Sequence, residues 1–377
     1  MGNFPTLPIA GALRVSPDSI LNMQTPVGKE IGTAGYYAAT VDHSIRAELT
    51  VTERTGMARY TFSSKEKQGT VIIGGGVAAT SIQVAAIKIT GPHSCEGYAE
   101  GGAFCGIPTP YKVYFVAEFD ADAESFGTWK EERLHANHTF AEGSHSGVYF
   151  TFPLKEGNQA VQYKIGVSYV SVENARENLR VENPAWDFSA VRQATQDKWN
   201  EYLGKIEVEG DNEDRQMQFY THLYRSLIHP NVCSDVNGEY MGADSQVHKT
   251  ARKFYTSFSN WDTYRTQTAL IAMLAPEETS DIVMSHYLFA EQSGGGFPRW
   301  VLANIETGVM QGDPTPILVA NAYAFGARNY DPRTLLRTMR YGAEVPGANS
   351  QGVLTRPGLE QLSLIHISEP TRRTPIS

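Results

Sequence analysis

The spacing of apolar residues changes once along the chain, near residue 186, and this change restricts the fold more than any other feature. Before that point apolar residues recur at every second position, most clearly over residues 45–51, 111–119 and 161–169. A period of two indicates strands with one face on a core and one on solvent. Further strands are expected over residues 58–62, 82–90 and 147–152. We therefore predict an antiparallel β-sandwich domain over residues 1–186.

A helix is expected directly after the sandwich. Asp187 or Ser189 suits its N-cap, the helix runs from Val191 to Leu203, and Gly204 ends it. We interpret residues 187–211 as a linker helix between two domains. The alternative is that this helix belongs to the second domain.

Beyond residue 211 the apolar residues follow helical spacing. Met217, Tyr220, Leu223, Tyr224 and Leu227 recur at intervals of three and four, which gives one apolar stripe. Later helices should begin after Trp261 and stop before Pro276, and should also cover residues 276–292, 314–328 and 332–340. Helices joined by loops that carry Trp, Asp and Arg are typical of an α/α barrel. The predicted fold class is α+β, with a partial barrel over residues 212–361.

Composition and charge narrow the class of protein. The formal net charge is −9 over 377 residues, which disfavours nucleic acid as a partner because phosphate binding needs a basic face. The sequence contains no run of 18 apolar residues, so we expect no membrane partner. Cys95 and Cys105 flank a loop and could pair in an oxidising compartment, or both could be free thiols.

Two loop regions in the helical part carry a mixture of residues suited to sugar binding. One is residues 258–265, and the other is residues 295–313. Aromatic faces stack on sugar rings, carboxylates accept hydrogen bonds from vicinal hydroxyls, and arginines hold the carboxylates. The candidate substrate-binding residues are Asp262, Arg265, Trp300, Asn304, Glu306 and Asp313.

Each candidate also has an ordinary structural explanation. Asp262 suits a helix N-cap, and Arg265, one turn further along, could pair with it or point into solvent. Trp300 could be a core residue, and Glu306 and Asp313 precede helices, where an acid favours the helix dipole. The sequence assigns none of these residues to a metal.

Several ordered motifs resemble glycoside hydrolase family 92, the calcium-dependent exo-α-mannosidases. In the sandwich these are residues 3–8, 35–37 and 48–56; in the helical part they are residues 259–265, 297–300, 303–307 and 312–313. The resemblance implies a β-sandwich, a linker helix and the first part of an (α/α)6 barrel. It also implies that the parent hydrolyses α-mannoside glycans with inversion and uses Ca²⁺.

The resemblance carries over one residue role. Asp262 matches the acid of the family's Trp-Asp-Thr motif and is expected to bind hydroxyls of the terminal mannose. The family's general acid, general base and calcium ligands are expected beyond Gln361, so no catalytic residue is assigned and the chain is expected to be an inactive fragment. The parent is expected to be periplasmic or secreted.

Residues 362–377 resemble a translated sequencing adapter, and we exclude them from the fold. The abrupt start of the chain also suggests loss of residues at the N-terminus.

Two alternative functions remain open. The parent could be another α/α-barrel glycosidase or phosphorylase, or it could be a carbohydrate-binding sandwich with a helical module that does not hydrolyse its ligand.

Overall fold

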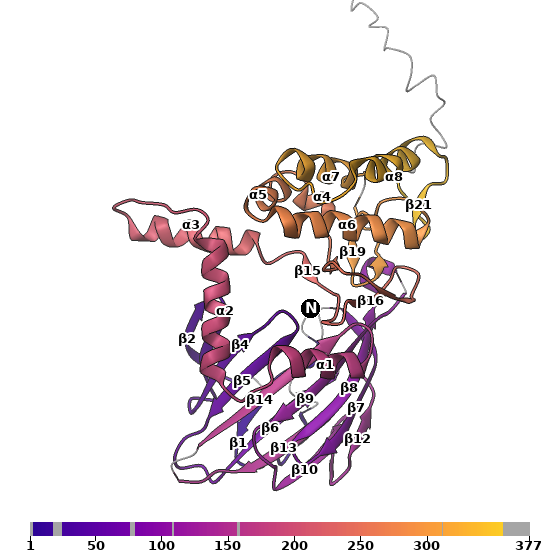
Figure 1. Ribbon diagram of the computed structural model, residues 1–377. Coiled ribbons are helices and arrows are strands. Elements are labelled where there is room, and N and C mark those ends of the chain that lie inside the picture. Colours follow the sequence, from indigo (N-terminus) through magenta and orange to yellow (C-terminus); the bar gives the residue numbers. More distant parts are fainter. Residues whose placement is uncertain are drawn as a thin grey trace, which may run out of the picture. The chain divides into compact units, whose positions relative to one another are not determined.

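A computed structural model describes residues 3–17, 25–75, 80–107, 109–156, 159–310 and 312–356. The chain forms two compact units (Figure 1). The sandwich unit comprises residues 1–241 and 247–253, and the helical unit comprises residues 242–246 and 254–377. The adapter-like segment 362–377 and Gln361 lie outside the described residues.

The larger sheet of the sandwich unit has nine strands, and the pairings described are antiparallel. In spatial order the strands are β12 (Phe140–Glu142), β7 (Ser81–Gly91), β8 (Ser94–Gly102), β9 (Tyr111–Phe119), β14 (Ala160–Ser168), β5 (Thr55–Thr61), β4 (Ile45–Val51), β3 (Tyr36–Val41) and β2 (Val27–Thr33). A 3-10 turn, Phe104–Gly106, follows β8.

The second sheet has five antiparallel strands and packs on the first. In spatial order the strands are β1 (Thr6–Ala10), β6 (Gln68–Gly74), β13 (Ser146–Pro153), β10 (Ser125–Lys130) and β11 (Arg133–Ala136). Phe119 of β9 meets Phe150 and Phe152 of β13 at ring-centroid distances of 5.0 and 4.9 Å. These buried aromatic residues form part of the layer between the sheets, so the predicted β-sandwich is confirmed.

One helix of the sandwich unit is missing from the sequence prediction. Helix α1 (Val172–Glu182) lies within the region assigned to strands, and it packs on β14 and β9 (Figure 1). Ala175 and Leu179 are buried on its inner face, against Val116 of β9. Gly166 of β14 permits this approach, because a Cβ there would overlap the carbonyl of Ala175. The sequence analysis names no helix over residues 172–182, so α1 is an addition to the predicted sandwich.

Helix α2 (Phe188–Leu203) has the N-cap that the sequence predicts. The Asp187 carboxylate accepts a hydrogen bond from the Ala190 backbone N–H at 2.9 Å, and the helix ends at Gly204. Phe188 is buried against Tyr36 and Met57 of the nine-stranded sheet. Helix α3 (Glu213–Ser226) follows, and it ends before His229.

The helical unit contains the remaining helices, which are α4 (Asn260–Thr263), α5 (Gln267–Leu274), α6 (Pro276–Ser293), α7 (Thr315–Ala324) and α8 (Pro332–Glu344). The single helix expected between Trp261 and Pro276 is thus broken into α4 and α5. Gly294, in the left-handed region at φ 115°, ends α6. Apolar residues of α5 to α8, among them Ala272, Val283, Leu318 and Leu335, form the unit's buried core.

Short strands complete the described elements. They are β15 (Asn231–Val232), β16 (Glu239–Met241), β17 (Val247–Lys249), β18 (Tyr255–Thr256), β19 (Val301–Leu302), β20 (Ile305–Glu306), β21 (Asn349–Ser350) and β22 (Val353–Leu354). Cys95, Cys105 and Cys233 are free thiols, so the possible pairing of Cys95 with Cys105 is not formed. Among the described helices, none combines the length and apolar character needed to cross a membrane.

Candidate functional site

Backbone pairing brings the two candidate loop regions of the helical unit together. Ser259 forms an antiparallel bridge with Trp300. On either side, the Asn260 N–H donates to the Arg299 carbonyl at 3.2 Å, and the Val301 N–H donates to the Phe258 carbonyl at 2.8 Å. The segment that leads into Asp262 therefore lies beside the segment that carries Trp300, although about forty positions separate them in sequence.

Asp262 is the exposed acid of this group. It lies in the first turn of α4, and one of its carboxylate oxygens accepts a hydrogen bond from the Ser259 hydroxyl. An ionised carboxylate offers about four acceptor positions, so one protein donor leaves room for ligand hydroxyls. The alternative explanation, a side-chain N-cap, does not hold, because Ser259 occupies the N-cap position.

Arg265 does not pair with Asp262. Its guanidinium lies over the rings of Trp261 and Tyr264, at 4.8 and 4.7 Å from their centroids, and donates to the Trp261 carbonyl. Stacking on aromatic faces suits the planar guanidinium. The pairing that the helical spacing allowed is therefore replaced by contacts that hold Trp261 in place.

Glu306 is a buried carboxylate held by the backbone. Its side chain accepts hydrogen bonds from the N–H groups of Arg299 at 2.5 Å, Trp300 at 3.2 Å and Gly308 at 2.9 Å. Burial raises the pKa of Glu306 above its usual value, and the three backbone donors oppose that rise. Glu306 thereby ties the β19–β20 hairpin to the backbone of Trp300, which is half-buried.

Asp313 pairs with Arg356, whose Nε lies 3.1 Å from Oδ2 of the carboxylate. Burial raises the pKa of Asp313, while the hydrogen bond from Arg356 acts in the opposite direction. The buried Arg299 also lowers this pKa through its charge, and it donates to the carbonyls of Met310 and Leu354. Asp313 therefore pairs with Arg356 and lies near the charge of Arg299, and these arginines offset part of the effect of burial.

Asn304 has a turn position between β19 and β20. Its side-chain amide donates to the Gly242 carbonyl at 3.3 Å, and its own carbonyl accepts from Gln351 at 2.8 Å. Of the six sequence candidates, backbone pairing brings the segments of Asp262, Trp300 and Glu306 together. Asn304 lies in the turn between Trp300 and Glu306, and Asp313 lies in the loop that follows.

The sequence prediction missed a buried polar network beneath α4. The fully buried ring of His286, on α6, lies 3.0 Å from the Asn260 side-chain oxygen and stacks on Phe258 at 3.8 Å. Asn260 in turn donates to Thr315 Oγ1 at 2.8 Å. Burial lowers the pKa of His286 to about 4, and a hydrogen bond to the Ile282 carbonyl acts in the opposite direction. This network fixes the first residue of α4, two positions before Asp262.

Family models match both parts of the chain. The glycosyl hydrolase family 92 catalytic domain matches residues 174–371, and the N-terminal domain of that family matches residues 1–168. The chain belongs to glycosyl hydrolase family 92.

Solved structures of family 92 enzymes share this fold. An α-mannosidase of Bacteroides thetaiotaomicron, also solved in complex with mannoimidazole, matches 91% of the chain with a TM-score of 0.82 and 23% identity. An inverting mannosidase of the same organism matches 93% of the chain with a TM-score of 0.81 and 24% identity. The predicted fold class, a sandwich followed by the first helices of the family's barrel, is confirmed.

A curated relative is an uncharacterized secreted glycosidase of Arthroderma benhamiae, which is 26% identical over 71% of the chain. The chain spans 37% of that relative's length, and 48% and 47% of the two solved structures. It thus covers about half the length of the solved family 92 enzymes.

The family 92 resemblance implies a calcium ion, and the described residues do not supply a recognisable site for it. Calcium in proteins is held by six to eight oxygen ligands, with carboxylates prominent among them. In the part of the chain that the structure describes, no three His, Cys, Asp or Glu side chains gather in a way that could hold a metal ion. We therefore derive no step of the chemistry through calcium.

Proposed function

We propose that the protein to which this family 92 chain belongs removes terminal mannose from α-mannoside glycans with inversion of configuration, and that it uses Ca²⁺. Membership of the family supports the reaction class. The mannosidase names of similar solved structures, one of them in complex with mannoimidazole, support mannose as the sugar. A relative named as secreted supports a periplasmic or secreted location.

The observation that carries the proposal is the exposed carboxylate of Asp262 in a rigid frame. Backbone pairing between Ser259 and Trp300 fixes the segment, and the Ser259 hydroxyl orients the carboxylate. We infer that the free acceptor positions of Asp262 bind two vicinal hydroxyls of the terminal mannose, with Trp300 beside the ring. Arg265, Asn304, Glu306 and Asp313 hold the surrounding loops in position.

Inversion needs two further carboxyl groups, one to protonate the leaving oxygen and one to activate water, roughly 6.5–9.5 Å apart. We infer that the family's general acid and general base are not among the carboxylates of this chain. We therefore assign the chain the role of positioning the sugar, and we expect it to show no turnover of an aryl α-mannoside by itself. Turnover by this chain alone would contradict that assignment.

The test of Asp262 uses the protein to which this chain belongs, with an aryl α-mannoside as the substrate. Loss of a charged acceptor for sugar hydroxyls should reduce kcat/KM of Asp262→Asn by about 100-fold. The control is Glu344→Gln, an exposed acid on α8 that pairs with Arg340, and it should leave kcat/KM unchanged. Equal activity of Asp262→Asn and the parent would show that Asp262 does not contact the substrate.

The same assay separates the alternative functions. Release of mannose 1-phosphate that depends on inorganic phosphate would identify a phosphorylase, and binding of mannosides without turnover by the parent would identify a carbohydrate-binding protein. Release of free mannose with the β-anomer formed first would support the inverting α-mannosidase.

A further inference from the structure

The sandwich unit contains a hollow of about 560 Å³ beside the turn between β4 and β5. It is lined by Arg54 together with residues 234–238 and 249–253. Four of its lining residues are cationic, namely Arg54, Lys249, Arg252 and Lys253, and one, Asp235, is acidic. Because the whole chain has a formal net charge of −9, this concentration of cations is a local feature of the hollow.

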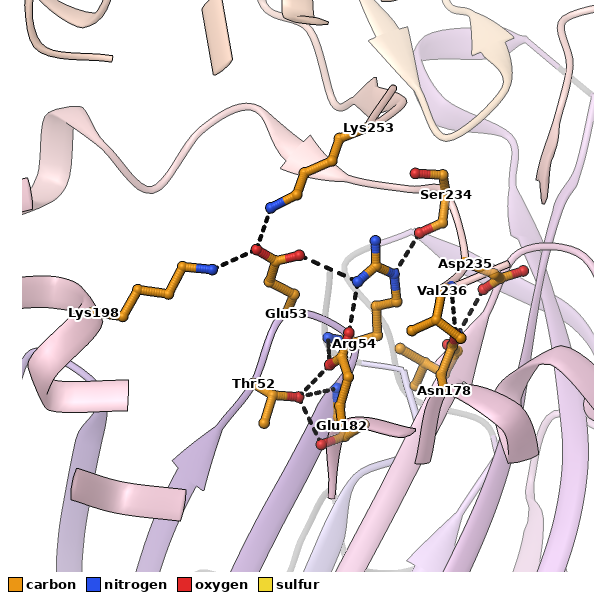
Figure 2. A network of polar contacts seen from close by, with 12 residues as sticks. Thr52, Glu53, Arg54, Asn178, Glu182, Lys198, Ser234, Asp235, Val236 and Lys253 are labelled. Carbon is orange, nitrogen blue, oxygen red and sulfur yellow. Dashed lines mark hydrogen bonds and ion pairs between the residues drawn. The ribbon is translucent and has the colours of Figure 1, made fainter. Parts of the chain in front are cut away.

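Arg54 is held rigidly and keeps one donor group unused. Its Nε donates to the Ser234 carbonyl at 2.5 Å, and its Nη1 lies 2.6 Å from the Glu182 carboxylate and 3.2 Å from Glu53. Its side chain is only 12% exposed. Among the described residues, Nη2 makes no hydrogen bond, and Figure 2 shows this nitrogen without a dashed line. A fixed guanidinium with a free N–H group is suited to an oxyanion.

A second free donor among the lining residues is Lys249, the last residue of β17. The ammonium group of Lys249 is exposed and has no hydrogen bond or ion pair within the part of the chain that the structure describes. Gly238 packs against the backbone beside Lys249, since it has φ 84° and accepts a backbone hydrogen bond from Thr250 at 2.9 Å. A Cβ at position 238 would overlap the Thr250 carbonyl, so the frame of the hollow requires glycine there.

The one acid of the lining does not cancel this charge. Asp235 is buried, and its oxygens accept hydrogen bonds from Ser168 at 2.7 Å, Asn174 at 2.8 Å and Asn178 at 2.6 Å. These donors belong to β14 and α1, so the carboxylate is committed to the protein. Lys253 is partly compensated by Glu53, 2.5 Å away, which also binds Lys198 (Figure 2).

We propose that this hollow binds an oxyanion, that is, a phosphate, sulfate or carboxylate group carried by a small molecule or a substituted glycan. Nη2 of Arg54 and the Lys249 ammonium supply the two donors, and Lys253 and Arg252 add positive charge. All residues of this site belong to the sandwich unit, whereas the proposed mannose contact belongs to the helical unit. Its ligand also differs in chemistry, since a mannoside is neutral.

The test is a calorimetric titration at low chloride concentration. The chain is titrated separately with inorganic phosphate, with glucuronate and with glucose. We expect phosphate or glucuronate to bind and glucose not to bind. Lys249→Gln should weaken that binding about fivefold or more, because a charge-assisted hydrogen bond is lost. The matched control is Lys198→Gln, which also removes one lysine charge but at a residue that does not line the hollow, and it should bind as the unsubstituted chain does.

Binding that is insensitive to Lys249→Gln, or equally strong binding of glucose and glucuronate, would overturn the proposal, and so would failure of both anions to bind. Arg54→Lys gives a second reading, because it keeps the charge but loses the planar fork. It should weaken binding about tenfold. Thermal unfolding shows whether the Arg54→Lys variant is folded. If it is not, Lys249→Gln, at an exposed position, decides whether the hollow binds the anion.

Discussion

Carboxylates are stabilised in opposite ways in the two units of this family 92 chain. In the sandwich unit, Glu53 lies among Arg54, Lys198 and Lys253, and although burial alone would raise its pKa, the hydrogen bonds from the lysines lower it to about 2. In the helical unit, Glu306 is held by backbone N–H groups, and burial raises its pKa. Opposite charges bonded directly to the carboxylate compensate Glu53, whereas backbone N–H groups bind Glu306 in a drier environment, with a further contribution from the charge of Arg299.

This difference separates two kinds of polar structure. A cluster of paired charges joins segments that are far apart in sequence, here residues 53–54, 182, 198 and 253 (Figure 2). A buried carboxylate that accepts hydrogen bonds from backbone N–H groups instead fixes the conformation of a single loop. Groups with raised pKa values are common near functional sites, and Glu306 and Asp313 both lie in the loops that we associate with the substrate.

The largest effect is expected for Glu306. Replacement by Ala leaves three backbone N–H groups without their acceptor, and each buried unpaired group costs about 1–3 kcal/mol. Glu306→Ala should therefore lower the free energy of unfolding of the helical unit by about 4 kcal/mol, measured by urea unfolding. Asp262→Ala is the control, since this exposed acid should change stability by less than about 0.5 kcal/mol. A loss below about 1 kcal/mol for Glu306→Ala would mean that water replaces the carboxylate.

The second largest expected effect is the change in stability with pH that His286 causes. Because the folded pKa is about 4 and the usual value is 6.5, the unfolded chain takes up a proton first as the pH falls. The contribution of His286 to stability is present above pH 6.5 and is lost as the pH falls toward 4. It amounts to roughly 3 kcal/mol.

The difference in stability between the unsubstituted chain and the His286→Gln variant, measured as a function of pH, isolates this contribution. Glu306 and Asp313 have raised pKa values and titrate with the opposite sign, but they are common to both proteins. His222→Gln, on the exposed face of α3, is the control and should show the parent's pH profile. If the two profiles of His286→Gln and the parent run parallel between pH 7 and 4, His286 does not titrate as its burial requires.

The fold was largely predictable because burial imposes a period on the sequence. Strands such as β4, β9 and β14 have one face on the core, and α6 and α8 begin at Pro276 and Pro332, where proline favours the first turn. Helix α1 was missed although Val172, Ala175 and Leu179 have helical spacing and Ser171 caps it. Eleven residues within a long strand region give too short a pattern to outweigh the period of two around them.

The sequence motifs indicated which segments carry the candidate residues, but not the contacts of their side chains. The sequence motifs place Asp262, Trp300 and Glu306 near one another, and backbone pairing brings their segments together. That Glu306 is buried and Asp262 exposed depends on tertiary packing, which no local pattern specifies. The roles of the six candidates toward a sugar stay predictions. The His286–Asn260 contact and the charge cluster around Glu53 join residues 26 to 200 positions apart, and no sequence spacing indicates them.

The smallest expected change in stability is that caused by replacing Glu53 of the sandwich unit. Glu53→Gln removes the partner of two lysines, but its side chain is 25% exposed, so solvent screening limits the loss to about 1 kcal/mol. Because the pKa of Glu53 is lowered, this stability is present above pH 4.5 and is lost as the pH falls toward 2. The loss caused by Glu53→Gln should shrink in 1 M NaCl, whereas the loss caused by Glu306→Ala, which involves no ion pair, should not. Equal salt dependence of the two variants would show that the contrast between charge pairing and backbone capture does not describe how these carboxylates are stabilised.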